Sequence, residues 1–210
     1  MKCPDDSAGT QMKCPKCKSI VDIPAEADHA GDSLGDYELV RKVGEGGMGS
    51  VYEAIQTKLG RKVALKILPR KFTEDDRFLG RFRREARSAA MLNHPNIIQV
   101  YDIDVDSGTH FFSMEYVDGE TLLQRMKRTG KLSPREAIEI IEKVADALGY
   151  AHDESIIHRD IKPENIMLSD KGRVKLADLG LAKQVDDADS NVTQSGAAVG
   201  TPYYMAPEQA

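Results

Sequence analysis

The ten-residue stretch IHRDIKPENI, residues 157–166, gathers side chains that could transfer a phosphoryl group. Asp160 could accept a proton from a hydroxyl group, Lys162 could neutralise charge on the moving phosphoryl group, and Asn165 could ligate a metal ion. Asp178 follows a short apolar run, and a lone carboxylate in that place suits Mg²⁺, which prefers oxygen ligands. Because each element that matches in order and spacing lowers the chance of coincidence, these residues together indicate phosphoryl transfer.

A glycine-rich segment, Gly44–Val51, precedes this stretch in the chain. Glycines let the backbone approach a phosphate without Cβ clashes, and a hairpin here could fold over a nucleotide. An ordinary hairpin turn is the alternative interpretation. A dinucleotide-binding fingerprint is excluded, because a strand-like run follows where that motif needs a helix.

A lysine, Lys66, lies inside the apolar run VALK at residues 63–66. Burying an ammonium group without a partner is unfavourable, so Lys66 should face a cleft and pair with an anion. Glu85, in a predicted helix, is the expected partner, and the pair would hold the ammonium near nucleotide phosphates. The alternative is that both residues are solvated surface charges.

A β-rich region followed by a helical region must position these residues. Residues 37–43, 51–57 and 62–68 are short β-type runs separated by turn-sized gaps, and they predict three antiparallel strands. Apolar residues at helical spacing predict a helix over 75–92. Further strands are predicted at 98–105, 110–116, 166–168 and 174–176.

A second helix is predicted from Ser133 to about His152. The sequence SPRE places serine at the cap, proline at the first helical position and Glu136 three residues after the cap, which is the pattern of a capping box. A helical apolar stripe continues from there and predicts a buried face. The stripe consists of Ala137, Ile138, Ile141, Val144, Ala145, Leu148 and Ala151.

The composition is that of a globular protein rather than of a disordered chain. Of the 210 residues, 40% are hydrophobic and 30% are charged, and the net charge is −5. The negative balance disfavours nucleic acids and anionic membrane surfaces as partners. No apolar run reaches the ~18–20 residues of a membrane helix, and the N-terminus lacks a secretory signal, so we expect a cytoplasmic chain.

The three cysteines, Cys3, Cys14 and Cys17, all lie near the N-terminus, so they cannot form a disulfide framework for the rest of the chain. Residues 1–35 are predicted to be a separate segment with a linker. The sequence CPKC at 14–17 resembles half of a zinc ribbon, and a Zn²⁺ site would use the three cysteines with Asp6 or His29. A decayed ribbon with free thiols is the alternative.

Residues 37–210 resemble the start of a eukaryotic-type protein kinase domain of the serine/threonine class, and are most similar to bacterial members. The matching motifs run from the glycine-rich loop to Ala206-Pro207-Glu208. The resemblance implies an α+β, bilobal fold, with a five-stranded antiparallel N-lobe that carries one helix, at 36–117, and a mainly helical, incomplete C-lobe at 118–210. It also implies transfer of the γ-phosphoryl group of ATP to serine or threonine hydroxyls of proteins, in signalling.

The same resemblance implies which residues bind ATP. The glycine-rich loop would cover the phosphates, Ala64 would touch adenine, and Lys66, anchored by Glu85, would contact the α and β phosphates. Met114 resembles the gatekeeper, and Glu115–Val117 resembles the hinge whose backbone hydrogen-bonds adenine. The implied residues of the glycine-rich loop are Gly44, Glu45, Gly46, Gly47, Met48, Gly49 and Val51.

Catalytic roles also follow from the resemblance. Asp160 would be the catalytic base and Lys162 would act beside it, while Asn165 and Asp178 would bind Mg²⁺. Thr201, in the sequence GTP, would contact Asp160 and Lys162 through its hydroxyl group. Both this sequence and the lysine of HRDIKPEN are typical of serine/threonine kinases, so tyrosine specificity is not expected.

Regulation is expected in the segment between Asp178 and the end of the chain. Thr193 and Ser195 are the expected phosphorylation sites, and a phosphate there would pair with Arg159 and order the segment. The family also implies dimerisation for activation. Leu179 replaces the usual phenylalanine of Asp-Phe-Gly, a change that the family tolerates because the side chain only packs.

The chain ends soon after the Ala-Pro-Glu motif, where the family continues with further helices. We therefore expect a truncated kinase domain that is poorly stable and essentially inactive by itself, and bacterial relatives often carry a membrane anchor beyond this point. The alternative function is a truncated or pseudokinase-like module that binds nucleotide or partners without turnover. Phosphorylation of small metabolites is disfavoured, because the region around Thr201 resembles a platform for protein substrates.

Overall fold

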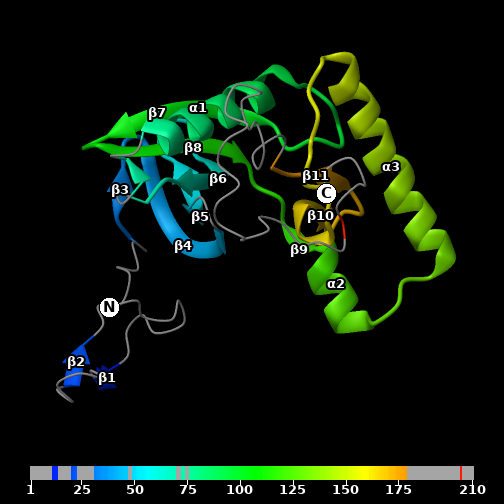
Figure 1. The fold of residues 1–210 in the computed structure, drawn as a ribbon, viewed down its shortest axis with the longest axis horizontal. Coiled ribbons are helices and arrows are strands. Elements are labelled where there is room, and N and C mark those ends of the chain that lie inside the picture. The colour runs from blue at the N-terminus through cyan, green and yellow to red at the C-terminus, as the bar shows by residue number, and fades with distance from the viewer. Residues whose placement is uncertain are drawn as a thin grey trace, which may run out of the picture.

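The structure is a computed structural model that describes residues 11–13, 20–22, 31–46, 49–69, 72–73, 76–178 and 204. The strands are β1 Gln11–Lys13, β2 Ile20–Asp22, β3 Ser33–Leu34, β4 Tyr37–Gly46, β5 Gly49–Gln56, β6 Arg61–Ile67, β7 Val100–Asp106, β8 Thr109–Glu115, β9 Gly119–Thr121, β10 Ile166–Ser169 and β11 Val174–Leu176. The helices are α1 Asp76–Met91, α2 Leu122–Thr129, α3 Pro134–Asp153 and a short 3₁₀ helix at Pro163–Asn165 (Figure 1).

The first half of the molecule is an antiparallel sheet in the order β3-β4-β5-β6-β8-β7, with α1 beside it (Figure 1). The five strands predicted between residues 37 and 116 are confirmed, and so is the helix predicted at 75–92. The two-residue strand β3 extends the sheet by pairing with the start of β4. An α+β fold with an antiparallel N-lobe is therefore present.

The two faces of this sheet bury different clusters, because successive strand residues point to opposite sides. On one face, Phe82 and Ala86 of α1 pack against Phe112 of β8. The other face buries Leu65 and Phe111 with residues of β4 and β5. The strand β6 is covered on both sides, which places Lys66 in an environment with little solvent.

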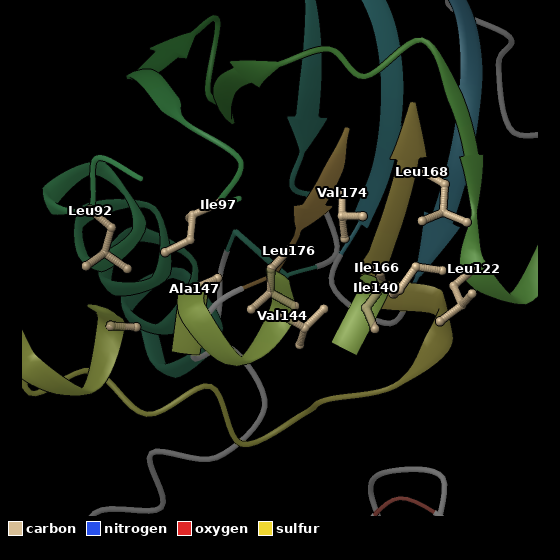
Figure 2. Close-up of a cluster of buried hydrophobic side chains, with 11 residues drawn as sticks. Leu92, Ile97, Leu122, Ile140, Val144, Ala147, Ile166, Leu168, Val174 and Leu176 are labelled. Carbon is tan, nitrogen blue, oxygen red and sulfur yellow. The ribbon is translucent and has the colours of Figure 1, made fainter. Parts of the chain in front are cut away.

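The second half is built on the antiparallel sheet β9-β10-β11, which α3 covers. Figure 2 shows the apolar side chains that converge between this helix and the strands. Leu176 and Ile97 are almost completely buried there, and Ile97 also forms an isolated bridge to Leu176. The full cluster is Leu92, Ile97, Leu122, Ile140, Val144, Ala147, Ala151, Ile166, Leu168, Val174 and Leu176.

The helix α3 begins where the sequence predicted, but its buried face overlaps the predicted stripe only in part, at Val144 and Ala151. Its buried side chains are Ile140, Val144, Ala147 and Ala151. Ile138 and Ile141, which belong to the predicted stripe, are 66% and 58% exposed. Apolar residues therefore lie on more than one face of α3, and the described residues bury only one of these faces.

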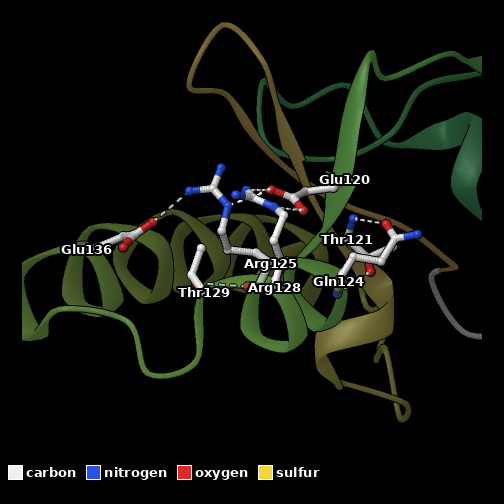
Figure 3. A network of polar contacts seen from close by, with 7 residues as sticks. All are labelled: Glu120, Thr121, Gln124, Arg125, Arg128, Thr129 and Glu136. Carbon is white, nitrogen blue, oxygen red and sulfur yellow. Dashed lines mark hydrogen bonds and ion pairs between the residues drawn. The ribbon is translucent and has the colours of Figure 1, made fainter.

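The predicted capping box at the start of α3 is half right. The Ser133 side chain accepts a hydrogen bond from the backbone N–H of Glu136 at 3.2 Å. The Glu136 carboxylate, however, accepts from Arg125 Nη1 at 3.2 Å instead of returning to the cap. A complete capping box stands at α2, where Thr121 and Gln124 bond each other reciprocally (Figure 3).

Glu120, just before α2, holds two arginine side chains (Figure 3). Its Oε1 lies 2.6 Å from Arg125 Nε, and it also pairs with Arg128. Hydrogen bonds from Arg128 and Arg125 lower the pKa of Glu120 from 4.5 to about 2. Because the folded pKa lies below the unfolded one, the network stabilises the fold above about pH 4.5 and loses this effect as pH falls towards 2.

We expect Glu120→Gln to lower the free energy of unfolding at neutral pH, and this difference from wild type should narrow steadily as pH falls below 4.5. Urea unfolding of both proteins between pH 7 and pH 3 measures the narrowing. A difference that stays constant over this range would show that the carboxylate does not stabilise the fold through its charge.

Candidate active site

The loop that follows α3 leads into the predicted chemistry-bearing stretch. Residues 156–162 have no regular secondary structure, and the 3₁₀ helix then passes directly into β10. Arg159 adopts a φ of +62°, in the left-handed region that residues other than glycine rarely adopt. Asp178 has the same property, with a φ of +55°. Such strained conformations persist only where the surrounding structure enforces them, and they are often found at functional sites.

Asp160, Lys162 and Asn165 meet at one carboxylate. Lys162 Nζ lies 2.7 Å from Asp160 Oδ2, and Asn165 Nδ2 donates to the same oxygen at 3.1 Å. Asn165 Nδ2 also donates to the backbone carbonyl of Asp160 at 2.8 Å, and the asparagine side chain is buried. Since both polar contacts of Asn165 use its nitrogen, its Oδ1 remains available as a ligand.

His158 links this loop to the strand that precedes Asp178. The ring is 1% exposed, its Nε2 lies 2.9 Å from the carbonyl oxygen of Ala177, and its Nδ1 accepts from the backbone N–H of Asp160 at 3.3 Å. These partners require a neutral ring with the proton on Nε2. Burial lowers the pKa of His158 and so favours that neutral form, although the nearby carbonyl and carboxylates oppose the shift.

Lys66 reaches the same place from the other half of the molecule. Its side chain is 8% exposed, and its Nζ donates to Asp178 Oδ1 at 3.0 Å. Burial alone would raise the pKa of Asp178, but the charge and hydrogen bond of Lys66, helped by the charge of Lys162, hold that pKa below its ordinary value. Asp178 is therefore an ionised carboxylate at neutral pH.

The partner predicted for Lys66, Glu85, lies on α1, but its side chain is outside the described residues. The sequence indicated an anionic partner for a lysine in an apolar strand, and Asp178 is one such partner. Lysine and aspartate lie 112 positions apart, so spacing in the sequence does not predict this pair.

The glycine-rich segment joins β4 and β5 as an antiparallel hairpin in which Gly46 pairs with Gly49 and Gly44 pairs with Val51. Glu45 forms an ion pair with Lys42 at 2.9 Å. Gly47 and Met48, which separate the two strands in the sequence, are outside the described residues. The two strands thus form the hairpin that the sequence predicted, and β5 pairs with β6, the strand that carries Lys66.

The residues predicted to face adenine lie on two neighbouring strands and on the segment that follows the second of them. Ala64 of β6 is opposite Met114 of β8, and Ala64 is buried. Glu115 ends β8, its backbone N–H donates to Gln99 at 2.8 Å, and the buried Val117 follows two residues later. Ala64 and Lys66 of β6 therefore lie beside β8 in one sheet, whereas Val117 lies just beyond the end of β8.

Several predicted site residues are outside the described part of the chain. The zinc prediction, the phosphorylation sites and the serine/threonine motif therefore stay predictions. These residues are Cys3, Cys14, Cys17, Thr193, Ser195 and Thr201. Within the described ranges, no group of three or more His, Cys, Asp or Glu side chains is arranged to hold a metal.

A cavity of about 540 Å³ lies between α1 and the strands β7 and β8, and it is lined by Arg83, Tyr101 and His110 among others. None of the predicted site residues lines it. The candidate site is therefore defined by converging side chains rather than by this cavity.

In the ranges that the structure describes, no helix is both long and apolar enough to span a membrane.

Sequence reasoning missed Lys175 and Glu53. Lys175 of β11 is buried and pairs with Glu115 at 2.6 Å. Glu53 of β5 is buried among Arg41, Lys62 and the hydroxyl group of Tyr116. The signal that singled out Lys66, a charge inside an apolar strand, was present at Lys175 too.

Comparison with known proteins agrees with this geometry. The family described as "Protein kinase domain" matches residues 37–210. The chain is 47% identical over 181 residues to the serine/threonine-protein kinase PknA of Mycobacterium tuberculosis, covering 84% of this chain and 42% of that protein. It is 41% identical over 176 residues to the serine/threonine-protein kinase PrkC of Bacillus subtilis, covering 84% of this chain and 27% of that protein.

A solved structure, the kinase domain of PknI from M. tuberculosis, aligns with a TM-score of 0.64 and 38% sequence identity, covering 74% of this chain and 62% of that one. The chain spans less than half the length of the curated relatives it matches. Sequence, fold and the converging residues lead to the same assignment: the chain belongs to the protein kinase domain family.

Proposed function

We propose that this chain forms part of a serine/threonine protein kinase, which transfers the γ-phosphoryl group of ATP to serine or threonine hydroxyls of proteins. The observation that carries the proposal is the convergence of Lys66, Asp160, Lys162, Asn165 and Asp178 from distant parts of the chain. Relatives that are named serine/threonine-protein kinases, at 41–47% identity, support it. The kinase domain would comprise residues 36–210, with 1–35 as a separate segment.

The donor atoms present fit a nucleotide-bound Mg²⁺ ion. Asn165 Oδ1 is left available by the hydrogen bonds of its nitrogen, and Asp178 uses only Oδ1 to accept from Lys66. Mg²⁺ binds proteins through one or two oxygen ligands and completes its shell with water and phosphate oxygens. Bound there, the ion would neutralise charge on the phosphates of ATP.

The side chains then divide the chemistry among them. The Asp160 Oδ2 atom is occupied by Lys162 and Asn165, which leaves Oδ1 to accept the proton of a substrate hydroxyl. Lys162 lies close enough to oppose the negative charge that develops on the transferred group. Lys66 would contact the α and β phosphates, and the hairpin with Gly44 and Gly49 would cover them.

The rival proposal is a module that binds nucleotide without turnover. The presence of every reacting side chain named above favours the enzyme. The test is incubation of the intact protein with radiolabelled ATP, Mg²⁺ and a protein acceptor, followed by phosphoamino acid analysis. Label on serine or threonine supports the enzyme, whereas saturable MgATP binding without any transfer would favour the rival.

For the N-terminal segment we propose a Zn²⁺ site made by Cys3, Cys14 and Cys17 with Asp6 or His29. The support is the sequence pattern alone, since a CPKC pair is suited to clamp one metal ion. Metal analysis of the purified protein should find about one zinc per chain, and a Cys14→Ser, Cys17→Ser variant should lose it. Equal zinc in both proteins would reject the site.

For regulation we propose that Thr193 and Ser195 become phosphorylated between two copies of the kinase that meet as a dimer. Arg159, beside Asp160, is exposed and could pair with the added phosphate. Mass spectrometry of the active protein should find phosphate on one of these residues. An active enzyme with neither residue modified would contradict this proposal.

A further inference from the structure

A second buried lysine, Lys175, lies behind the candidate site. Its side chain is 9% exposed, and its Nζ lies 2.6 Å from Glu115 Oε2. The same Nζ donates to the backbone carbonyl of Ile97 at 3.2 Å. Glu115 is itself only 15% exposed, so both charges of the pair are largely removed from water. A buried pair is weak support for stability, because desolvation offsets the attraction between its charges, and a different role has to be considered.

The pair connects segments that hold opposite ends of the proposed nucleotide site. Glu115 ends β8 and opens the segment 115–117, whereas Lys175 lies on β11, the strand that leads to Asp178. Backbone hydrogen bonds surround the pair. Leu176 N–H donates to Asn96 at 2.8 Å, and Glu115 N–H donates to Gln99 at 2.8 Å.

The side chain of Asn96 adds to the same junction, because its Nδ2 donates to the carbonyl of Val174 at 2.8 Å. Residues 96–99, which connect α1 to β7, are thereby fixed to β11 on one side and to the end of β8 on the other. The ammonium of Lys175 closes this junction, since it contacts both Ile97 and Glu115 and so joins β11 to these two segments.

The residue after Glu115 is anchored in the opposite direction. The Tyr116 hydroxyl donates to Glu53 Oε2 at 2.9 Å, and Glu53 is a buried residue of the large sheet. Burial alone would raise the pKa of Glu53, but Lys62, Tyr116 and Arg41 outweigh it and keep the carboxylate ionised. Consecutive residues of the segment are thus tied to different sheets, which leaves this connection little freedom to shift.

We propose that Lys175 is a positioning residue that fixes the segment 115–117 relative to β11, the strand that leads to Asp178. This inference rests on the proposed function, in which the segment binds adenine and Asp178 holds the metal that binds the phosphates. The Glu115–Lys175 pair then sets the spacing between the two ends of the nucleotide site. Shifts of about 1 Å at reacting groups can change rates by about a hundredfold, so a rigid spacer has a large effect.

A purely structural role for the pair makes a different prediction. If Lys175 served only to neutralise the buried Glu115, removing both charges together would restore stability and nucleotide binding alike. If the pair sets the spacing, removing both charges restores stability but leaves the two ends of the site uncoupled. A ligand that occupies both ends would then bind more weakly, whereas a ligand that occupies only the adenine end would not.

The experiment compares Lys175→Met, Glu115→Gln and the double variant in the intact protein. Urea unfolding measures stability, and titrations measure the affinity for MgADP, which spans the site, and for adenosine, which has no phosphates. We expect the double variant to be more stable than Lys175→Met. Its affinity for MgADP should remain about tenfold weaker than that of wild type, while its affinity for adenosine changes less than about twofold.

Arg173→Met is the matched control. Arg173 Nη1 lies 3.7 Å from Glu115 Oε1, but its side chain is 55% exposed, so the loss of this contact should leave both affinities unchanged. If Lys175→Met does not fold, the double variant still gives the comparison with wild type, because it leaves neither buried charge without its partner. Equal weakening of MgADP and adenosine, or wild-type affinity for both, would overturn the inference. Failure of wild type to bind MgADP would overturn the proposed function, and this inference with it.

Discussion

Asp160→Asn in the intact protein is expected to lower the rate of phosphoryl transfer by about 10²- to 10⁴-fold, the usual contribution of a general base. The amide cannot accept the hydroxyl proton. It has the size of the carboxylate and keeps an oxygen for Lys162 and Asn165, which now contact Asp160 Oδ2 at 2.7 and 3.1 Å. The fold and the affinity for MgATP should therefore survive. Initial rates with radiolabelled ATP and a protein acceptor measure the change.

Asp170→Asn provides the matched control, because Asp170 is an exposed residue of the turn between β10 and β11. Its transfer rate should equal that of wild type. Lys66→Met should also lose transfer, since it leaves Asp178 without the ammonium that lies 3.0 Å away. Full turnover in Asp160→Asn would mean that another group accepts the proton.

Gly49→Ala is expected to have the second large effect, on the stability of the fold rather than on the rate of phosphoryl transfer. Gly49 has a φ of +142°, and a Cβ atom built on it would stand 2.1 Å from the carbonyl oxygen of Ile67. That oxygen belongs to the backbone of the neighbouring strand and cannot turn away, so the hairpin must shift. We expect the free energy of unfolding to fall by about 2 kcal/mol or more, measured by urea unfolding.

Gly44→Ala tests the same substitution in the same hairpin. Its nearest neighbour would be Val51 Cβ at 3.9 Å, an ordinary contact, and its φ is not in the left-handed region. Its stability should change by no more than about 0.5 kcal/mol. Equal losses in the two variants would show that the close approach at Gly49 is not what requires glycine.

Local signals in the sequence predicted much of the fold. The strands β4 to β8 and the helix α1 follow from β-type runs, glycine turns and apolar spacing, all of which act over a few residues. The start of α3 follows from Ser133, whose side chain caps the helix as expected. The pairing of β4 with β5 likewise follows from two neighbouring β-type runs and the glycines between them.

Features that depend on distant parts of the chain were not predicted. Which face of α3 is buried depends on where the sheet β9-β10-β11 lies, so Ile138 and Ile141 are exposed although they fit a helical stripe. Glu136 fits a capping box, but Arg125 from α2 competes for its carboxylate. The strand β9 and the helix α2 are short, so local signals for them are weak. Whether β9 forms depends on its pairing with β10, which comes much later in the chain.

The candidate site also combines residues that local sequence signals predict with residues that only long-range contacts bring together. Asp160, Lys162 and Asn165 lie within one short motif, so their proximity follows from the sequence. The pairing of Lys66 with Asp178 joins two halves of the chain and follows from the sequence only through the family resemblance. The pair of Glu115 and Lys175 also joins distant parts of the chain. The apolar run around Lys175 indicates a buried charge, but nothing in the sequence identifies Glu115 as its partner.

The most direct test of the assembled site is one titration: the binding of ATP, with and without Mg²⁺, to wild type, Asp160→Asn and Asp178→Asn in the intact protein. Wild type and Asp160→Asn should both bind ATP more tightly when Mg²⁺ is present, because Asn165 and Asp178 remain to hold the ion. Asp178→Asn should lose most of this gain. A full Mg²⁺ gain in Asp178→Asn, or no ATP binding by wild type, would contradict the site described above.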